Sequence, residues 1–466
     1  MNKTSMIATI GPTCNTKEII KQFILSGVNV FRINLGSVDH DFCVDVIDKI
    51  RSLDDELDTV SSIMFDIVGP VVKTGSFVDG SAFFTEGVKI RIYDHDIMGD
   101  CTKLYIDYFD LIDGVQYNSL IKFSNSSVVF KVLDKGSDYL LCQVLVEGVI
   151  FDNSTVYLEE NCTVFLSERD RDDIIFADAM NVDFLALSYV SNVENVLDVN
   201  DLLIELGNDH ISIISKIELS DAVNDIDDII RVSDGVMVAR SDLVFDVPVE
   251  RIPGIQKMVI NKCHYANKLS IISVDVLSSD DAFSRVQVSD IANAVLDGCD
   301  AIMLSFDEKN GYFPIDSVDT IRKVIVETES GIDYIGLLDK SLRSNSSDVT
   351  GGLAYSVSEL SIRLDCNCIV CPTISGYTAR KISRFRTKCP IIAISPNVNT
   401  VKSLNMYFGI YPILIDELKS IDETIDKSRE VSCKYLDLSS GDKIIITGGY
   451  PFSKSKHTNF IKVEEI

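Results

Sequence analysis

Six side chains that could do chemistry lie at or just after the ends of short apolar runs: Arg32, Asn34, Asp66, Lys216, Glu218 and Asp242. Lys216 and Glu218 are two residues apart, so on a strand both would face the same side. Carboxylate oxygens suit Mg²⁺, which takes few protein ligands and keeps water and substrate phosphate. An ammonium and a guanidinium beside such a metal can stabilise a phosphoryl group in transfer. These residues predict metal-assisted phosphoryl transfer, although a metal-dependent aldolase or an enolising enzyme would use similar groups.

The apolar runs before these side chains have the pattern of buried parallel strands, because they lack polar–apolar alternation and helix-like stretches follow most of them. Eight such runs are present, at residues 5–10, 28–33, 61–66, 183–188, 211–216, 234–239, 269–274 and 299–304. Eight strand–helix units predict a closed (β/α)₈ barrel, and an open doubly wound sheet is the alternative. The carboxyl ends of barrel strands share one rim, where the six side chains would meet. The alternative is that each charged side chain at this rim forms an ion pair within the fold and affects only stability, which is reasonable for Arg240.

The regular spacing of these runs is interrupted once, and a separate set of apolar runs begins toward the C-terminus. More than a hundred residues between Asp66 and Asp183 show partial alternation with Gly-, Asn- and Asp-rich turns, which is typical of a small β domain. A polar stretch at 341–347 is followed by further apolar runs at 367–371, 390–395, 411–415 and 443–447, which predict a doubly wound α/β domain. We therefore expect a catalytic barrel of residues 1–72 and 168–336, an inserted β lid domain of residues 73–167, and a C-terminal α/β domain of residues 337–466.

Composition limits the partners and the compartment. The 466 residues carry 43 Lys and Arg against 71 Asp and Glu, a formal net charge of −28, which disfavours nonspecific binding to nucleic acid or to an anionic membrane. We expect a soluble, cytoplasmic protein with reduced thiols, because no signal-peptide pattern or membrane-length apolar run is present. Cys366, Cys368 and Cys371 lie within an apolar run, which favours a buried strand over a metal site.

The chain resembles the pyruvate kinase family over essentially its full length, through five segments in matching order and spacing. They are residues 8–12 (ATIGP), 29–34 (NVFRIN), 215–218 (SKIE), 233–243 (SDGVMVARSDL) and 289–294 (SDIANA). The resemblance implies a (β/α)₈ TIM barrel with a β-barrel lid inserted after the third strand, and a C-terminal α/β domain, usually in a homotetramer. It also implies transfer of phosphate from phosphoenolpyruvate to ADP, a step of glycolysis, with Mg²⁺ or Mn²⁺ and often K⁺.

Carried over by position, the resemblance implies roles for the charged rim residues. Lys216 would stabilise the transferring phosphoryl group, and Arg32 would bind the phosphate. Glu218 and Asp242 would be the Mg²⁺ ligands.

The resemblance also implies sites for the substrate carboxylate, the nucleotide and K⁺. The backbone at Ser241, at the start of a helix together with Asp242, would receive the carboxylate, because N–H groups there favour an anion. Pro12 and Lys73 would lie at the nucleotide, and Asn34 and Asp66 would be two of the K⁺ ligands.

Several rim positions depart from the family pattern near the expected K⁺ and nucleotide sites. Gly36 and Ser37 stand where the family usually has Ser and His, so Gly36 lacks an oxygen that helps to hold K⁺. Val68 replaces a lysine, and Lys73 offers a point charge where the family has a bidentate arginine. Val71 replaces a position that is commonly Glu in K⁺-dependent members and Lys in independent ones.

Further departures lie near the expected substrate. Ser241 and Val244 replace two glycines, so a side chain can crowd the carboxylate site. Residues 305–308 replace the family's Ser-Gly-Glu-Thr. Val274 stands where the family has a threonine implicated in protonating the enolate of pyruvate, and loss of a positioned proton donor typically costs about 10²–10⁴ in rate. We therefore expect Val274→Thr to raise turnover at least about tenfold.

A loop in the C-terminal domain resembles the loop that holds a sugar-phosphate effector in regulated pyruvate kinases. Its hydroxyls and backbone N–H groups precede a helix-like stretch and would form a phosphate site from Thr373, Ser375, Gly376 and Thr378. An ordinary Ser/Thr-rich helix cap is the alternative. A second loop at 450–457 has two Lys in place of the family's glycines.

Three hypotheses about function remain open from the sequence. The first is a working but impaired pyruvate kinase, favoured by the four charged residues Arg32, Lys216, Glu218 and Asp242. The second is a noncatalytic subunit that assembles with an active paralogue in a hetero-oligomer, favoured by the departures at the rim. The third is a protein that senses phosphorylated sugars or nucleotides through the C-terminal domain, which leaves the metal pair unexplained.

Overall fold

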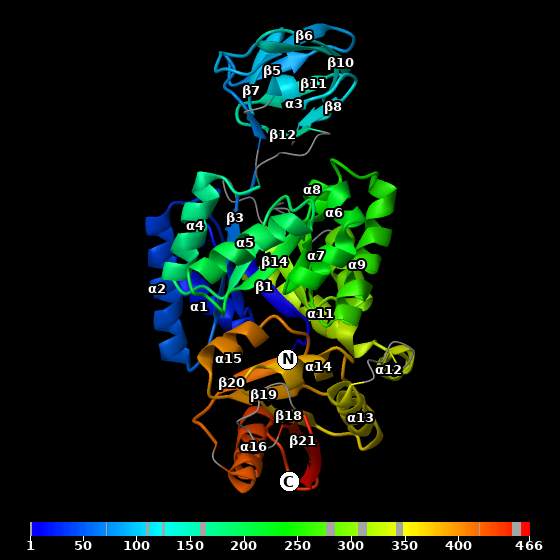
Figure 1. Cartoon of the computed structure of the whole chain (residues 1–466). Coiled ribbons are helices and arrows are strands. Elements are labelled where there is room, and N and C mark those ends of the chain that lie inside the picture. The colour runs from blue at the N-terminus through cyan, green and yellow to red at the C-terminus, as the bar shows by residue number, and fades with distance from the viewer. Residues whose placement is uncertain are drawn as a thin grey trace.

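The computed structural model shows three parts stacked along one axis, with the lid domain above the barrel and the C-terminal domain below it (Figure 1). The structure describes residues 2–70, 72–108, 111–123, 126–158, 165–275, 285–305, 315–341, 348–418, 420–449 and 458–466. Val71, most of the polar stretch at 341–347, the residues 306–308 and the loop at 450–457 therefore lie outside the described residues.

Eight parallel strands in the described part of the chain close into a barrel, which confirms the predicted (β/α)₈ fold. They are β1 (Ser5–Thr9), β2 (Val30–Asn34), β3 (Ser62–Ile67), β13 (Phe184–Leu187), β14 (Ser212–Ile217), β15 (Gly235–Val238), β16 (Leu269–Asp275) and β17 (Ala301–Ser305). Each strand pairs with its neighbours in sequence order, and β17 closes the ring against β1. The open-sheet alternative is thereby excluded.

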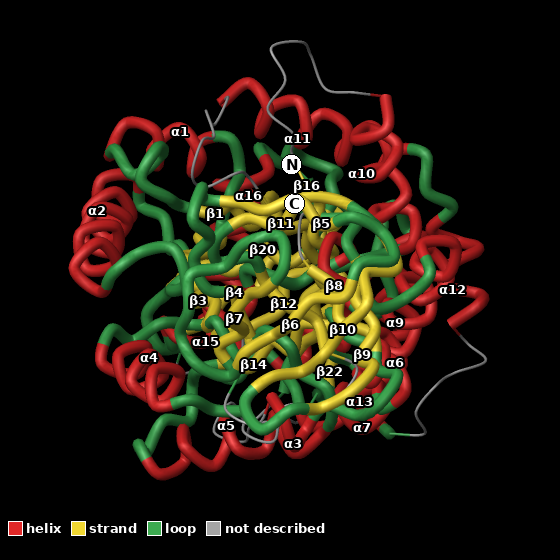
Figure 2. The backbone as a smooth tube through the Cα atoms, turned by 90° about the horizontal axis from the view of Figure 1, so that it is seen from above, coloured by secondary structure: helices red, strands yellow, loops and turns green. Residues whose placement is uncertain are grey.

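The described helices form an outer ring around the strands, as the view from above shows (Figure 2). They are α1 (Lys17–Leu25), α2 (His40–Leu57), α4 (Glu168–Ala179), α5 (Val193–Glu205), α6 (Ser220–Asn224), α7 (Ile226–Val232), α8 (Arg240–Leu243), η1 (Val249–Arg251), α9 (Ile252–Ala266), α10 (Arg285–Asp297) and α11 (Ile315–Ser330). Local sequence fixes several helix starts. Ser167 and Asp170 form a capping box at the start of α4, where two otherwise unpaired N–H groups gain partners.

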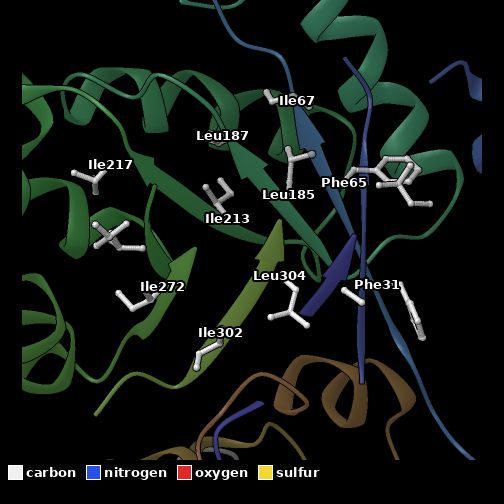
Figure 3. Packing of buried hydrophobic residues seen from close by; sticks show 14 of the residues in the cluster. Phe31, Phe65, Ile67, Leu185, Leu187, Ile213, Ile217, Ile272, Ile302 and Leu304 are labelled. Atoms are coloured by element: carbon white, nitrogen blue, oxygen red, sulfur yellow. The ribbon is translucent and has the colours of Figure 1, made fainter. Parts of the chain in front are cut away.

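Strand residues alternate between the barrel interior and the layer between barrel and helices. Outward-facing side chains such as Phe31, Leu185, Ile217 and Ile272 pack together in that layer (Figure 3). Inward-facing positions such as those of Ile214 and Met237 fill the interior. Two residues after Ile214, Lys216 has the same inward position nearer the rim, so the alternation directs polar side chains into the mouth of the barrel.

The lid domain lies between β3 and α4 in the chain, as predicted, and contains a closed seven-stranded barrel with a two-stranded sheet. Its elements are β4 (Val72–Thr74), β5 (Ser81–Phe84), β6 (Lys89–Tyr93), β7 (Lys103–Asp107), α3 (Leu111–Gly114), β8 (Leu120–Phe123), β9 (Val129–Lys135), β10 (Tyr139–Val146), β11 (Gly148–Phe151) and β12 (Thr155–Leu158). Its own core includes Phe84, Phe123 and Phe130, which pack edge to face. The strands β4, β5, β8 and β11 were not predicted, because they are short.

The passage from β3 toward the lid depends on a glycine. Gly69 has φ +69°, and a Cβ at this position would lie 2.7 Å from the carbonyl oxygen of Ser188. Its N–H donates to Asp170 Oδ1 at 3.1 Å. No other residue type adopts this conformation in so little space, so Gly69 holds the exit of β3 against the barrel rim.

The C-terminal domain has a five-stranded sheet in the order β20-β19-β18-β21-β22. Its strands are β18 (Cys368–Pro372), β19 (Ile391–Ser395), β20 (Ile410–Leu414), β21 (Lys443–Gly448) and β22 (Phe460–Glu465), and the described helices near it are α12 (Tyr334–Ser341), α13 (Val349–Arg363), α14 (Tyr377–Ser383), α15 (Val398–Leu404) and α16 (Ile421–Leu436). The antiparallel edge strand β22 was not predicted. Cys366, Cys368 and Cys371 are buried free thiols in or beside β18, as the apolar run predicted.

Ion pairs join the C-terminal domain to the bottom of the barrel. Arg386 donates to Asp300 Oδ1 at 2.6 Å, and Lys402 lies 3.4 Å from Asp183 Oδ1. The two aspartates precede β17 and β13, and each also accepts a backbone N–H from a neighbouring strand of the barrel. Buried carboxylates with several partners tie the two parts together, since loss of one partner would leave a charge unpaired. None of the described helices has both the length and the apolar character needed to cross a membrane.

Candidate active site

Arg32 and Asp66 form the first part of the site, at the ends of the neighbouring strands β2 and β3. The strands pair in parallel with Asn34 opposite Asp66, so Arg32 reaches along the rim to the carboxylate. Arg32 Nε donates to Asp66 Oδ2 at 2.7 Å, and Nη1 donates to Thr9 Oγ1 at 3.0 Å. Arg32 and Asp66 are buried. A guanidinium held in this way presents its planar fork of donors in a fixed direction.

Lys216 lies between two carboxylates at the end of β14. Its Nζ is 2.9 Å from Glu218 Oε1 and 3.3 Å from Asp66 Oδ2, and it donates to Ser188 Oγ at 2.9 Å. Burial lowers the pKa of Lys216, but Asp66 and Glu218 outweigh it and raise that pKa above its usual value. Burial alone would raise the pKa of Asp66, but Lys216 and Arg32 outweigh burial and hold that pKa below its usual value. The ammonium and the Asp66 carboxylate are therefore both charged at neutral pH.

Glu218 and Asp242 form an acidic pair beside this lysine. Glu218 Oε2 accepts the backbone N–H of Tyr189 at 2.7 Å. The pKa of Glu218 lies above its usual value. Burial is the main cause; the Lys216 ammonium opposes it, and the neighbouring Asp242 carboxylate adds to it. Glu218 is buried and Asp242 is half-buried, and two neighbouring carboxylates that repel one another fit a divalent cation, which would relieve the repulsion.

The rest of a metal's coordination shell would come from outside the protein. Among the described residues, no group of three or more His, Cys, Asp and Glu side chains is arranged to hold a metal ion. Mg²⁺ usually binds one or two carboxylates and completes its six positions with water and substrate phosphate. Glu218 and Asp242 fit that pattern, and they do not fit a dedicated protein cage.

A cleft of about 640 Å³ opens above these groups, between the barrel rim and the lid domain. The predicted residues that line it are Arg32, Asn34, Asp66, Lys73, Lys216, Glu218 and Asp242. Residues Phe151–Thr155 and Lys73 form its lid-side wall, so the lid lies over the carboxyl ends of the barrel strands. The structure thus brings together residues from β2, β3, β14 and the lid that are far apart in sequence.

Two predicted residues lie away from this lining. Pro12 is exposed in the turn after β1, and Ser241 is exposed on α8; neither lines the cleft. Ser241 lies in the first turn of α8, where the N–H of Asp242 is 3.3 Å from the Ala239 carbonyl oxygen. A place for the nucleotide at Pro12 and for a carboxylate at Ser241 stays a prediction. Arg240 pairs with Asp290 at 3.2 Å, which confirms that it is internally paired.

Val274 does not stand where the sequence comparison expected it. It is 1% exposed and packs in the layer between barrel and helices, on the same side of β16 as Ile272, and it does not line the cleft. Alternation along β16 gives the inward position to Ser273, whose carbonyl oxygen accepts from Arg240 at 3.2 Å. This packing weighs against the expectation that a hydroxyl at 274 would serve the substrate.

The expected K⁺ ligands have partners within the protein. Asn34 Oδ1 accepts the N–H of Gly36 at 3.0 Å, and Asn34 Nδ2 donates to Ser37 Oγ at 3.0 Å. The other ligand, Asp66, already has Arg32 and Lys216 beside it, so its charge is largely balanced. A K⁺ site at Asn34 and Asp66 stays a prediction.

Tyr189 belongs to the site and Tyr157 of the lid lies near it, although the sequence did not single them out. Tyr189 lines the cleft, and its backbone has φ +56°, with its N–H on Glu218. Tyr157 comes from the lid strand β12, and its ring lies near that of Tyr189, with centroids 6.5 Å apart. Single aromatic residues are common in cores, so only the contact between lid and barrel reveals their place.

Two family models cover most of the chain. The model described as pyruvate kinase, barrel domain, matches residues 1–318, and the one described as pyruvate kinase, alpha/beta domain, matches residues 352–464. The chain belongs to the pyruvate kinase family. A pyruvate kinase of Clostridium perfringens is 36% identical over 100% of both chains, and one of Clostridium acetobutylicum is 33% identical over the same share.

A solved pyruvate kinase structure agrees with the fold. The pyruvate kinase of Cryptosporidium parvum has a TM-score of 0.91 and 29% sequence identity, and the match covers 100% of this chain and 96% of that one. This pyruvate kinase family member therefore keeps the family's three-part architecture despite the altered rim.

The C-terminal loop predicted to hold an effector is well connected internally. The Thr373 hydroxyl accepts the N–H of Gly376 at 2.9 Å, and Thr378 Oγ1 is 2.7 Å from Thr458 Oγ1. Gly376 has φ +72°, and Arg380 donates to the carbonyl oxygen of Ser375 at 3.3 Å. These contacts also fit an ordinary helix cap, so the phosphate site stays a prediction.

Proposed function

We propose that this chain is a pyruvate kinase-type phosphotransferase that converts phosphoenolpyruvate and ADP to pyruvate and ATP, with reduced turnover. The proposal rests on one observation, the buried network in which Arg32, Asp66, Lys216 and Glu218 are held within 3.4 Å of one another in a chain of contacts. Such a network preorganises positive charge for a transferring phosphoryl group without reorganisation during the reaction.

Each cation of the network has a distinct task. Lys216 stays protonated, and its ammonium would face the phosphoryl group as charge develops on the equatorial oxygens. Arg32 would bind a phosphate oxygen pair through its planar fork, with its direction fixed by Asp66 and Thr9. In the transfer, an oxygen of the ADP β-phosphate bonds to phosphorus while the bond to the enol oxygen breaks.

The resulting enolate takes up a proton at its methylene carbon to give pyruvate. The cleft-lining residues described here do not single out the proton donor, and Val274 faces away from the cleft. Lys73, exposed on β4 at the lid-side wall, would attract the nucleotide phosphates as a point charge.

Glu218 and Asp242 would hold Mg²⁺, or Mn²⁺ in its place. When bound, the ion supplies charge neutralisation between the phosphate groups of the two substrates. The residues themselves set where it binds, because Glu218 is oriented by Lys216 and by the Tyr189 N–H. A K⁺ site at Asn34 and Asp66 would be weak.

Reduced turnover is proposed because one positively charged group of the family pattern is absent and a second is replaced by a different cation. Val68 lines the cleft and provides no ammonium, and Lys73 cannot form the bidentate contact of an arginine. The same observations support a second candidate function, a noncatalytic subunit that assembles with an active paralogue. The intact Lys216–Glu218 pair favours the catalytic proposal.

A coupled assay of pyruvate formation by the purified protein, alone and co-expressed with an active paralogue, tests the choice. The catalytic proposal predicts pyruvate formation by the protein alone, and its loss in Lys216→Met. Formation only in the co-expressed sample, unchanged by Lys216→Met in this chain, would establish the noncatalytic role. Assembly as a homotetramer, a location in the cytoplasm and a sugar-phosphate effector at Thr373–Thr378 are proposed on the family relationship alone.

A further inference from the structure

The lid-side wall of the cleft includes an exposed aromatic residue. Phe151, the last residue of β11, lines the cleft and is 52% exposed. Its neighbour Ile150 is fully buried in the lid core. Because side chains alternate along a strand, Phe151 faces away from that core.

Phe83 is a comparable side chain that lies outside the cleft lining. In the antiparallel pair of β5 and β11, Val149 lies opposite Phe83. Val149 and Phe151 are two residues apart, so Phe151 and Phe83 share one face of that sheet. Phe83 is also 52% exposed, but it does not line the cleft. Single exposed apolar side chains are common on protein surfaces, so it is the position in the cleft that distinguishes Phe151.

Hydrogen bonds hold the backbone of Phe151 in place. Its carbonyl oxygen accepts from Thr74 Oγ1 at 3.2 Å and from Ser154 Oγ at 2.9 Å. The N–H of the next residue, Asp152, donates to the carbonyl oxygen of Gly80 at 3.1 Å. A ring on a fixed backbone offers a flat surface that loses little conformational freedom when a ligand covers it.

A cation lies on the same wall. Lys73 is exposed on β4 and lies opposite Thr155, four residues after Phe151. The residue after Lys73 is Thr74, whose hydroxyl binds the Phe151 carbonyl oxygen. One wall of the cleft therefore offers a point charge that suits a phosphate and an aromatic ring that suits a nucleic-acid base.

The rest of the described cleft lining favours Phe151 as the surface for a base. Arg32 and Lys216 lie on the barrel side, where phosphoryl transfer is proposed. Pro12, which the sequence placed at the nucleotide, does not line the cleft. Among the described lining residues, Tyr189 is half-buried and Phe151 is the exposed aromatic residue.

We propose that Phe151 is a base-binding residue, on whose ring the purine base of the nucleoside diphosphate stacks while its phosphates extend past Lys73 to the barrel rim. The faces of a base and of a phenyl ring are both π systems, and replacement of a stacked aromatic residue by alanine typically weakens binding about five- to a hundredfold. The lid thereby contributes to nucleotide binding through a ring as well as a charge. This inference rests on the proposed function, in which ADP occupies this cleft.

Tryptophan fluorescence of the full-length protein tests the stack directly, because the chain contains no tryptophan. Phe151→Trp places a single indole on the wall, and we expect ADP with Mg²⁺ to quench its emission in a saturable way. Phe83→Trp, on the same face and equally exposed, is the matched control and should keep its emission. Inorganic pyrophosphate, which has the phosphates without a base, should quench neither variant.

Calorimetric titration with ADP and Mg²⁺ measures the contribution of the ring to affinity. Phe151→Ala should weaken ADP binding about five- to a hundredfold and leave the affinity for pyrophosphate unchanged. Phe151→Trp, which keeps an aromatic face, and Phe83→Ala, which alters the ring outside the cleft, should both bind ADP as the wild type does.

The outcomes separate the role of Phe151 from the proposed function. Equal ADP affinity of Phe151→Ala and the wild type, an equal loss of pyrophosphate affinity, or equal quenching of Phe151→Trp by pyrophosphate and ADP overturns the role of Phe151. The proposed function still stands in those cases if the wild type forms ATP. Absence of ADP binding by the wild type overturns both. Loss of ADP affinity alone in Phe151→Ala, with quenching confined to Phe151→Trp, supports both.

Discussion

The Lys216 ammonium at the end of β14 and the Glu218 carboxylate just after that strand form an ion pair of 2.9 Å at the base of the cleft. Both side chains are buried, so neither charge is screened by solvent. The lysine also faces Asp66 at 3.3 Å, and each carboxylate has a further protein partner. The pair is therefore part of a fixed electrostatic site, which is the arrangement that phosphoryl transfer requires.

Replacement of Arg32 by lysine should lower the efficiency with phosphoenolpyruvate while the fold is kept. Lys keeps the charge but cannot contact Asp66, Thr9 and a phosphate at once, so we expect kcat/KM to fall about tenfold to a hundredfold. Steady-state kinetics against phosphoenolpyruvate measure the change. Arg240→Lys, which alters a paired arginine outside the cleft lining, is the control; equal effects of the two variants would contradict the role of Arg32.

Val274→Thr should not restore activity, in contrast to the expectation from sequence. The new hydroxyl would enter the apolar layer beside Ile272, and an unpaired buried hydroxyl lowers the free energy of unfolding by about 1–3 kcal/mol. We expect turnover and the exchange of solvent deuterium into pyruvate to stay at the wild-type level, with a lower midpoint of urea unfolding. A rise of turnover by about tenfold, the size typical of a gained proton donor, would show that position 274 serves the substrate after all.

The repeating strand–helix units of the barrel could be predicted from the sequence, because each barrel strand is an apolar run that precedes a stretch with helical periodicity. The rim was also predictable, because parallel strands end at one edge and Arg32, Asp66, Lys216 and Glu218 lie at or just after the ends of such runs. The short lid strands β4 and β11 and the edge strand β22 gave too little periodicity to detect.

The sequence could not show which way individual side chains face or which distant residues come into contact. Val274 aligns with a family threonine, yet its side chain faces the helices, since a shift of one residue along a strand exchanges the two faces. Tyr157 carried no signal, because its ring comes close to that of Tyr189 only through a contact between the lid and the barrel. Long-range contacts of this kind depend on the closed arrangement of the whole chain.

K⁺ should activate this protein only weakly. Gly36 provides no side-chain oxygen, and a Cβ there would lie 3.1 Å from Val68 Cγ2 and 3.2 Å from Asn34 Oδ1. Gly36→Ser alone should therefore change little, whereas Gly36→Ser with Val68→Ala should increase the response, because the two sites are in contact and their effects are not additive. Rates in KCl and in tetramethylammonium chloride at equal ionic strength measure it. Strong, saturable activation of the wild type at low K⁺ would contradict this prediction.

Acid should weaken the junction between barrel and C-terminal domain through His264. Burial lowers the pKa of His264 to about 3, and the adjacent Arg386 guanidinium contributes, so the folded protein keeps the ring neutral. In the unfolded chain the ring takes a proton near its ordinary pKa of about 6.5, so stability falls as pH drops from there toward about 3. Urea unfolding at pH 7 and pH 5 should show a smaller loss for His264→Gln than for the wild type. An equal loss in both proteins would mean that His264 does not contribute.

Phosphorus NMR of a single sample gives the most direct test of the central claim, that the Arg32–Asp66–Lys216–Glu218 network transfers a phosphoryl group. The purified protein is mixed with phosphoenolpyruvate, ADP and Mg²⁺, and the phosphoenolpyruvate and ATP γ-phosphate signals are followed with time. We expect the first signal to decline as the second grows in equal amount, more slowly than with the Clostridium perfringens relative, and Lys216→Met to abolish the exchange. Absence of ATP above the Lys216→Met background, in protein that binds Mn²⁺ at Glu218 and Asp242, would contradict it.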